Sequence, residues 1–206
     1  QNPPFFGDFK INEFNKNFGQ LFKEVLINSP CNKIYQKKLI DDYQIRFKEN
    51  VNMGEDLLFN LEYLKFCTRI SIINECLYNY TSYKNSNSLT KSFKENLFEN
   101  QKMLFEKIRE YLNECASYEN NKDIIENIYT NNILGCFCNL FHRQSTLDSS
   151  SIKKEINKIV SDETVTNNIV YFLKGNLPKR LIGYFIKRKN INLIYYSFLI
   201  IKNILK

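Results

Sequence analysis

Residues 123–142 read DIIENIYTNNILGCFCNLFH, and this stretch decides the fold class. Its apolar side chains recur at the three- and four-residue spacing of an α-helix and cover a wide arc, which predicts a buried helix. They are Ile124, Ile128, Ile133, Phe137, Leu140 and Phe141. The stretch from Phe93 to Ala116 has the same spacing, and Ser92 with Glu95 has the form of a capping box at its start. Two long helices are therefore expected in the middle of the chain.

The composition favours helices along the rest of the chain as well. The 206 residues include only six Gly and four Pro, too few for the many turns of a β-sandwich or barrel. Hydrophobic residues make up 43% and charged residues 25%, which is typical of folded globular proteins and excludes disorder. The sequence therefore predicts a folded protein built largely of helices.

Short strands are expected only in the first half of the chain. Residues 69–74 and 77–83 are rich in Ile and Tyr, which predicts two short strands, whereas residues 11–28 have helical periodicity. The character of the sequence changes near residue 90, so we expect a mixed region over 1–90 and an all-helical region over 91–206. The expected fold class is mainly α (α+β), with two to four short strands.

The positive charge is concentrated at the C-terminal end. The chain has a formal charge of +7, yet the last acidic residue is Glu163, and eight Lys or Arg follow it. Apolar stretches alternate with these bases over 174–206, which is typical of an amphipathic helix at an anionic membrane surface. The alternative is a pair of terminal helices whose apolar faces pack on the domain. Nucleic acid is not expected as a partner, because the bases form no recognisable binding motif.

Several kinds of chemistry are excluded or disfavoured by the residues present. His142 is the single histidine, no motif supports a catalytic triad, and no Gly-rich phosphate loop occurs. Cys136, Cys138 and His142 offer too few ligands on one helix face for zinc, so no metal site is expected within this chain. The six cysteines include no C-x-x-C pair, and no signal peptide is visible, so we expect reduced thiols and a cytoplasmic protein. Catalysis by carboxylate side chains therefore remains as the main enzymatic possibility.

The carboxylate candidates are Glu55 and Asp56, which open a predicted helix after Gly54. Backbone amides and the helix dipole stabilise negative charge at such a position, and an ionised carboxylate near a bound hydroxyl can act as a general base. The same placement is also ordinary capping chemistry. The pair alone therefore leaves both interpretations open.

The segments around this pair resemble a known family in their order and spacing. They are Ser29–Ile40, Ile45–Phe47, Glu55–Asn60, Ile70–Ile73, Leu77–Tyr80 and Ser86–Ser88. Together they resemble the acceptor-side half of the bacterial family 2 glycosyltransferases with the GT-A fold. That family has an N-K-L-Y-like helix start, a short i-x-F strand, an E-D pair opening the next helix, and an L-Y-x-Y strand before a Ser-containing loop. The resemblance covers about residues 29–90, and many relatives have Arg where Thr81 stands here.

The resemblance implies transfer of a sugar, with inversion, from a nucleotide-diphospho-sugar to a hydroxyl of a glycan or lipid-linked acceptor. Asp56 would be the general base, and Glu55 would orient the acceptor or support the loop. Lys33 and Tyr35 would lie near the acceptor cleft. Tyr78 and Tyr80 would lie on the strand behind it.

The family's nucleotide-binding half and its Asp-x-Asp motif, which holds Mg or Mn against the diphosphate, have no counterpart in these residues. We therefore expect the chain to be the C-terminal portion of a longer enzyme, with 1–90 as the acceptor-side part and 91–206 as a helical region with a basic amphipathic tail. The divalent cation would belong to the longer enzyme and not to this chain. The isolated chain is expected to be inactive and to self-associate as a homodimer.

The longer enzyme would assemble a polysaccharide or glycoconjugate in the cytoplasm, at the inner face of a bacterial membrane. The alternative function is a non-catalytic helical interaction module, in which Glu55 and Asp56 only cap a helix.

Overall fold

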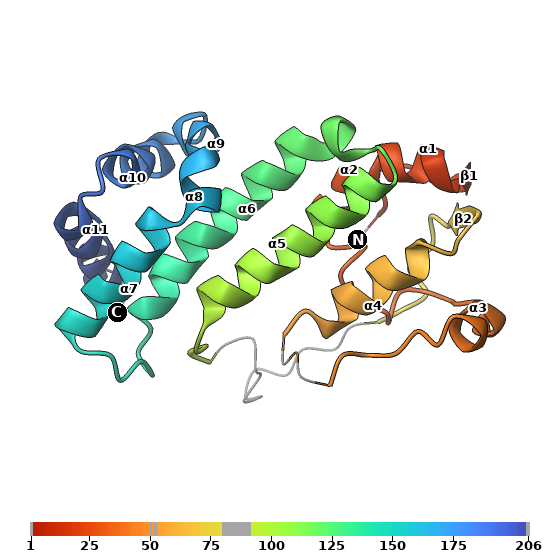
Figure 1. Cartoon of the computed structure of the whole chain (residues 1–206), viewed down its shortest axis with the longest axis horizontal. Coiled ribbons are helices and arrows are strands. Elements are labelled where there is room, and N and C mark those ends of the chain that lie inside the picture. Colours follow the sequence, from red (N-terminus) through yellow and green to blue (C-terminus); the bar gives the residue numbers. More distant parts are fainter. Residues whose placement is uncertain (1, 50, 52, 80–91, 205–206) are drawn as a thin grey trace. The chain divides into compact units, whose positions relative to one another are not determined.

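The structure, a computed structural model, describes residues 2–49, 51, 53–79 and 92–204 (Figure 1). Its elements are, in chain order, β1 (Gly7–Lys10), α1 (Ile11–Lys16), α2 (Phe18–Lys23), α3 (Lys37–Asp42), α4 (Glu55–Leu64), β2 (Arg69–Ile72), α5 (Leu97–Glu114), α6 (Tyr118–Leu140), α7 (Ser149–Ser161), α8 (Glu163–Asn167), α9 (Ile169–Leu173), α10 (Leu177–Lys187) and α11 (Ile191–Ile204). The fold is therefore mainly α with two short strands in the described part of the chain, as the sequence predicts.

The chain forms two compact units that are not contiguous in sequence. Unit 1 combines residues 1–82 with 103–125, and unit 2 combines 83–102 with 126–206. Helices α5 and α6 each contribute one part to unit 1 and the other part to unit 2. The division of function near residue 90 stays a prediction.

Unit 1 contains the two strands, which form an antiparallel pair. Gly7 lies opposite Ile72, and Lys10 lies opposite Arg69. The strand predicted at 69–74 is present as β2, but its partner β1 was not predicted. The second predicted strand is wrong at residues 77–79, which are irregular, and its remaining residues lie outside the described part.

The helix predicted over 11–28 is two short helices. Its break is at Asn17, whose side-chain amide donates to the Glu13 carbonyl, a local bond that competes with helix continuation. The predicted apolar face is buried through Phe18 and Leu21, but Val25 is exposed, because it takes a left-handed conformation with φ of 59° after α2 has ended.

The core that supports the start of α4 lies on one side of that helix. Phe59 and Tyr63 from α4 are buried together with Ile45 and Cys67. The partly buried side chains that pack against them come mostly from the preceding loop, α3 and β2. These are Ile11, Tyr35, Leu39, Ile40, Phe66 and Ile70. The apolar residues of the predicted i-x-F segment thus serve as core contacts of α4, although Ile45–Phe47 is irregular and not a strand.

The capping box predicted at Ser92 does not start a helix, since α5 begins at Leu97. The Asn139 side chain holds the Lys94 backbone instead: it accepts from the amide at 3.0 Å and donates to the carbonyl at 2.8 Å. Asn96 then takes a left-handed conformation with φ of 52° immediately before the helix. A long-range contact within unit 2 therefore outweighs the local capping signal.

The regular elements that the structure describes in unit 2 are all helices, joined by irregular segments. The predicted helices near 151–160 and 163–174 are present as α7 and as the pair α8 and α9, and the basic tail forms α10 and α11. Helix α10 packs on α9, and α11 packs on α7. Within the described residues, no helix is both long enough and apolar enough to cross a bilayer.

Candidate active site at the start of helix α4

Helix α4 begins at a backbone position that requires glycine. Gly54 has a φ of 93°, in the left-handed region, and its carbonyl accepts the first helical bond from the Leu58 amide at 3.0 Å. A Cβ at this position would lie 2.5 Å from the Leu104 side chain. The close approach to Leu104 fixes where α4 starts, and it places Glu55 and Asp56 in the first turn at the positive end of the helix dipole.

The loop over residues 26–36 is tied together by Lys33. The Lys33 ammonium donates to the carbonyls of Leu26 at 2.7 Å and Ser29 at 2.5 Å, and to Oδ1 of Asn32 at 2.8 Å. These three acceptors come from the same turn of chain. Lys33 therefore has a structural role in shaping the loop, in addition to any role in binding.

The same loop is attached to α4 by side chains of the helix. The Tyr35 hydroxyl donates to Oδ1 of Asn60 at 2.5 Å, and Nδ2 of Asn60 donates to the Ile27 carbonyl at 2.7 Å. The Tyr63 hydroxyl accepts from the Gln36 amide at 2.8 Å. These bonds hold the loop against the second half of α4, at Asn60 and Tyr63.

Lys33 and Tyr35 lie on the inner side of this loop. Both are partly buried, whereas Ile34 between them is 99% exposed. This alternation is typical of an extended segment, in which successive side chains point to opposite sides. The Tyr35 ring also packs edge-on against Phe59, with ring centroids 5.4 Å apart. The extended backbone thus turns both side chains inward, and that of Tyr35 contacts α4.

The charges of three predicted site residues influence one another. Burial raises the pKa of Asp56, the neighbouring Glu55 charge raises it further, and the Lys33 charge lowers it in part. Burial lowers the pKa of Lys33 to about 8, against the opposing effect of Asp56. Burial raises the pKa of Tyr35, and the Asp56 charge adds to this. The structure therefore brings Asp56, Glu55, Lys33 and Tyr35 into one neighbourhood.

The Asp56 carboxylate has no hydrogen-bond partner among the residues that the structure describes, and α4 has no side-chain cap. Two other aspartates at helix starts behave differently. Asp148 accepts from the Ser151 amide at 2.8 Å, and Asp162 accepts from the Thr164 amide at 2.8 Å. The pKa of Asp148 is lowered by the Ser151 hydrogen bonds. Asp56 thus differs in both contacts and proton affinity from an aspartate that caps a helix in this chain.

Of the two remaining predicted site residues, Tyr78 and Tyr80, the structure describes only Tyr78. Tyr78 lies in the irregular segment after β2 and is 52% exposed, so the expectation that it lies on a strand is wrong. Tyr80 lies outside the described residues. A strand behind the site therefore receives no support from the part of Leu77–Tyr83 that the structure describes.

Asn60 is the residue that the sequence analysis did not single out. It is 1% exposed and accepts from Tyr35 while donating to the backbone of Ile27. A buried amide must satisfy its hydrogen bonds, so it fixes the geometry of the groups that it contacts. The available signal was an asparagine within the apolar face of α4, between Phe59 and Tyr63.

A surface hollow of about 400 Å³ is lined by residues 43–49 and Glu62. Its wall includes Phe47, which stacks on Phe59 with ring centroids 4.4 Å apart. Bases and acids of the same segment complete the lining, so the hollow is mixed in polarity. Asp56 is not part of the hollow.

The residues described here do not fit the divalent cation that the family resemblance implies. In the described ranges, no group of three or more His, Cys, Asp or Glu side chains is placed so that it could hold a metal ion. Glu55 and Asp56 by themselves give two carboxylates, fewer than the six oxygen ligands typical of Mg²⁺. No chemical step is therefore assigned to a metal held by these residues.

Comparisons with protein-family models, with curated proteins and with solved structures give no match to this chain. The likeness to family 2 glycosyltransferases therefore depends on the order and spacing of the motifs in residues 29–90.

Proposed function

We propose that this chain carries the acceptor side of an inverting glycosyltransferase, with Asp56 as the general base. The observation that supports this most directly is the state of the Asp56 carboxylate. It has no hydrogen-bond partner among the described residues, its pKa is raised by burial and by Glu55, and it lies near Lys33 and Tyr35. A raised pKa brings a carboxylate closer to the operating pH, where a general base is most effective.

In the proposed reaction, Asp56 accepts the proton of an acceptor hydroxyl as the hydroxyl oxygen attacks the anomeric carbon of the donor sugar. A new glycosidic bond forms, the bond from the anomeric carbon to the diphosphate breaks, and the nucleoside diphosphate leaves with the bonding electron pair. Glu55 raises the proton affinity of Asp56. Lys33 opposes it, and so keeps Asp56 ionised before the acceptor binds.

We assign no donor-binding site to these 206 residues. We assign the nucleotide-sugar and the divalent cation to other parts of a longer enzyme, so the chain alone is proposed to be inactive. The parent reaction would build a polysaccharide or glycoconjugate on a glycan or lipid-linked acceptor at the cytoplasmic face of a bacterial membrane.

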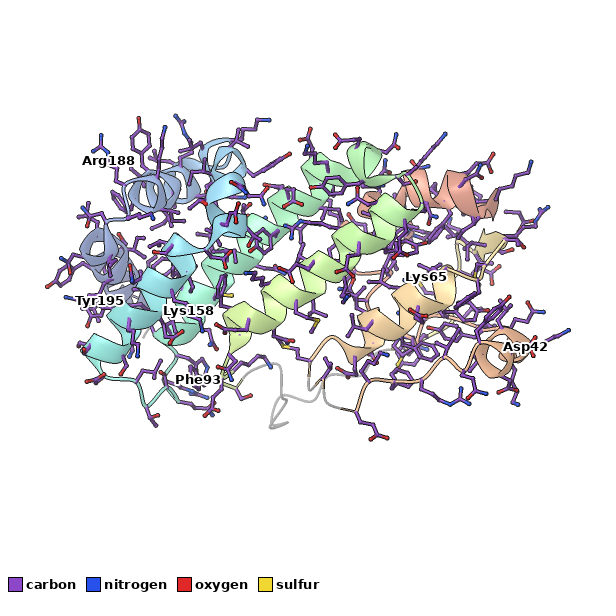
Figure 2. All side chains as sticks on the ribbon, in the orientation of Figure 1. Asp42, Lys65, Phe93, Lys158, Arg188 and Tyr195 are labelled. Carbon is purple, nitrogen blue, oxygen red and sulfur yellow. The ribbon has the colours of Figure 1, made fainter. Side chains whose placement is uncertain are left out.

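The test is a transfer assay on the protein encoded by the full open reading frame that contains this chain. Asp56→Asn should lower kcat by about 10²- to 10⁴-fold, the usual contribution of a general base. The matched control is Asp42→Asn, the same change at the exposed end of α3 (Figure 2). It should retain wild-type activity.

A non-catalytic interaction module is the alternative, and it makes the opposite prediction. If Glu55 and Asp56 only cap α4, Asp56→Asn should leave any transfer activity unchanged and should lower the thermal midpoint instead. Activity that does not respond to Asp56 would therefore contradict the proposed function.

A further inference from the structure

Helix α10 exposes apolar side chains on its outer face. Its inner face is buried through Ile182 and Ile186, which are 7% and 0% exposed. On the other face, Leu177, Leu181 and Tyr184 are 66%, 49% and 54% exposed and follow one another at helical spacing. An outer face in water is ordinarily polar, so this stripe is not explained by the packing of unit 2.

Helix α11 has the same arrangement. Ile194 and Phe198 are buried, and the Phe198 ring lies 5.4 Å from that of Phe137 in the core of unit 2. Leu193, Tyr196 and Ile200 are 44%, 54% and 58% exposed and recur at helical spacing on the outer side. Each of these two consecutive helices thus has an exposed apolar stripe.

All formally charged side chains within residues 164–206 are positive. Five exposed bases lie in or beside α10, and they are Lys174, Arg180, Lys187, Arg188 and Lys189. Residues 164–206 contain no Asp or Glu. The Arg188 guanidinium lies over the Tyr184 ring, 5.6 Å from its centroid, so a base lies directly beside an exposed side chain of the α10 stripe.

We propose that the outer faces of α10 and α11 bind the surface of an anionic lipid bilayer. The exposed Leu, Ile and Tyr side chains enter the boundary between headgroups and acyl chains, and the bases contact lipid phosphates. Tyr is suited to this depth, because its ring is apolar and its hydroxyl is polar. This inference does not depend on the proposed enzymatic function, since it uses only residues of unit 2.

Charge decides between the possible occupants of this surface. A second copy of the same face would bring bases against bases, and no acid within 164–206 would compensate for their repulsion. A nucleic acid would neutralise the bases but would leave the Leu and Ile stripe without an apolar partner. An anionic bilayer supplies both negative charge and an apolar interior.

The first test is co-sedimentation of the purified chain with vesicles of phosphatidylcholine, with and without about 30% phosphatidylglycerol. Binding is expected for the anionic vesicles only and should weaken as salt rises from about 0.1 M to about 0.5 M. Arg180→Gln with Arg188→Gln should weaken it about 30-fold, on the basis of about 1 kcal/mol for each base near an anionic surface. Leu181→Ser with Tyr184→Ser should weaken it at least about 10-fold.

The matched control removes two exposed lysines from unit 1, through Lys23→Gln with Lys38→Gln. It should change binding by less than about 3-fold, because those bases lie outside the proposed surface. Circular dichroism of each variant tests whether the fold is retained. Equal loss in the control, or equal binding to neutral vesicles, would overturn the proposal, as would a dimer that the same variants disrupt without any vesicle binding.

A second test uses the absence of tryptophan from the chain. Tyr184→Trp introduces a single reporter on the surface, and its emission should shift to shorter wavelength when anionic vesicles are added. Phe6→Trp is the control, at a position that is 65% exposed in unit 1. An unshifted Tyr184→Trp, or the same shift at both positions, would contradict insertion of this face.

Discussion

Asp56 and Asp148 are the same residue type near the start of a helix, but Asp148 is the N-cap residue of α7 and Asp56 is the second residue of α4. Asp148 accepts a hydrogen bond from a helix amide, which stabilises the carboxylate. Asp56 has no such bond to a described residue, and burial with the Glu55 charge disfavours its ionised form. At the residue scale, one aspartate contributes to folding and the other is held in a state that costs stability, as is common for functional groups.

This contrast predicts opposite effects of Asp56→Asn and Asp148→Ala on the free energy of unfolding. The pKa of Asp56 is raised in the folded state, so its ionisation penalty develops as pH rises above about 3.8 and is fully present at pH 7. Asp56→Asn should leave stability at pH 7 unchanged or higher, and Asp148→Ala should lower it by about 1 kcal/mol. Urea unfolding at pH 7 measures both, and a loss at Asp56 as large as that at Asp148 would support capping.

The burial of Lys33 predicts that its contribution to the free energy of unfolding becomes more favourable as pH rises. Its pKa is about 8 in the folded state and 10.5 in an unfolded chain, so the folded state releases this proton first. The unfolding free energy of the wild type minus that of Lys33→Met should therefore increase, by about 1 to 2 kcal/mol, as pH rises from about 8 to about 10.5. Lys37→Met, at an exposed position on α3, should show no such trend. A flat difference for Lys33→Met would show that the lysine is not desolvated.

At the element scale, α4 is the helix that organises the candidate site. Its start is fixed by Gly54 against Leu104, and its buried Asn60 holds the loop that carries Lys33 and Tyr35. The sequence predicted the helix and the acidic pair, because periodicity and turn residues are local signals. It did not predict the role of Asn60, because that role depends on a contact with Tyr35, 25 residues away.

Contacts between residues far apart in the sequence also explain the other errors. The capping box at Ser92 failed because Asn139 binds the Lys94 backbone, and β1 was missed because its four residues show no alternation of their own and pair with a strand about 60 residues later. Tyr78 was placed on a strand by local composition and by the family resemblance, neither of which reports a long-range pairing. Local patterns therefore predicted most of the helices, whereas long-range hydrogen bonds decided the boundaries.

Two glycines in helical settings predict opposite results on conversion to alanine. At Gly54, φ of 93° and the contact with Leu104 oppose a Cβ, so Gly54→Ala should destabilise the chain by about 1 to 3 kcal/mol. At Gly135, inside α6, nothing lies within 4 Å of an added Cβ, so Gly135→Ala should stabilise by about 0.5 to 1 kcal/mol. Thermal unfolding distinguishes the two, and a neutral Gly54→Ala would contradict the described start of α4.

Asn60 predicts a loss of both stability and site geometry. Asn60→Leu leaves the Tyr35 hydroxyl and the Ile27 carbonyl without their partner, which should cost about 2 to 4 kcal/mol. Tyr35→Phe removes only one of these bonds and should cost about 1 kcal/mol. The exposed Asn157→Leu in α7 is the control and should cost less than about 0.5 kcal/mol. Equal values for Asn60→Leu and Asn157→Leu would rule out the linking role of Asn60.

At the scale of the whole molecule, the two units carry different features. Unit 1 holds the carboxylate pair with Lys33 and Tyr35, and unit 2 holds the basic apolar face of α10 and α11. The two proposals can therefore fail independently, since vesicle binding does not depend on Asp56 and proton transfer does not depend on Arg188. An enzyme that acts on a lipid-linked acceptor would use both.

The most direct test of the central claim is the pH dependence of kcat/KM for the protein from the full reading frame. A general base must be ionised, so activity should fall on the acidic side as Asp56 becomes protonated. Because the Glu55 charge raises the pKa of Asp56 and the Lys33 charge lowers it, Glu55→Gln should move this acidic limb to lower pH and Lys33→Met should move it to higher pH. Opposite shifts of this kind are the predicted result. A limb that neither change moves, or one that persists in Asp56→Asn, would contradict the assignment of Asp56 as the base.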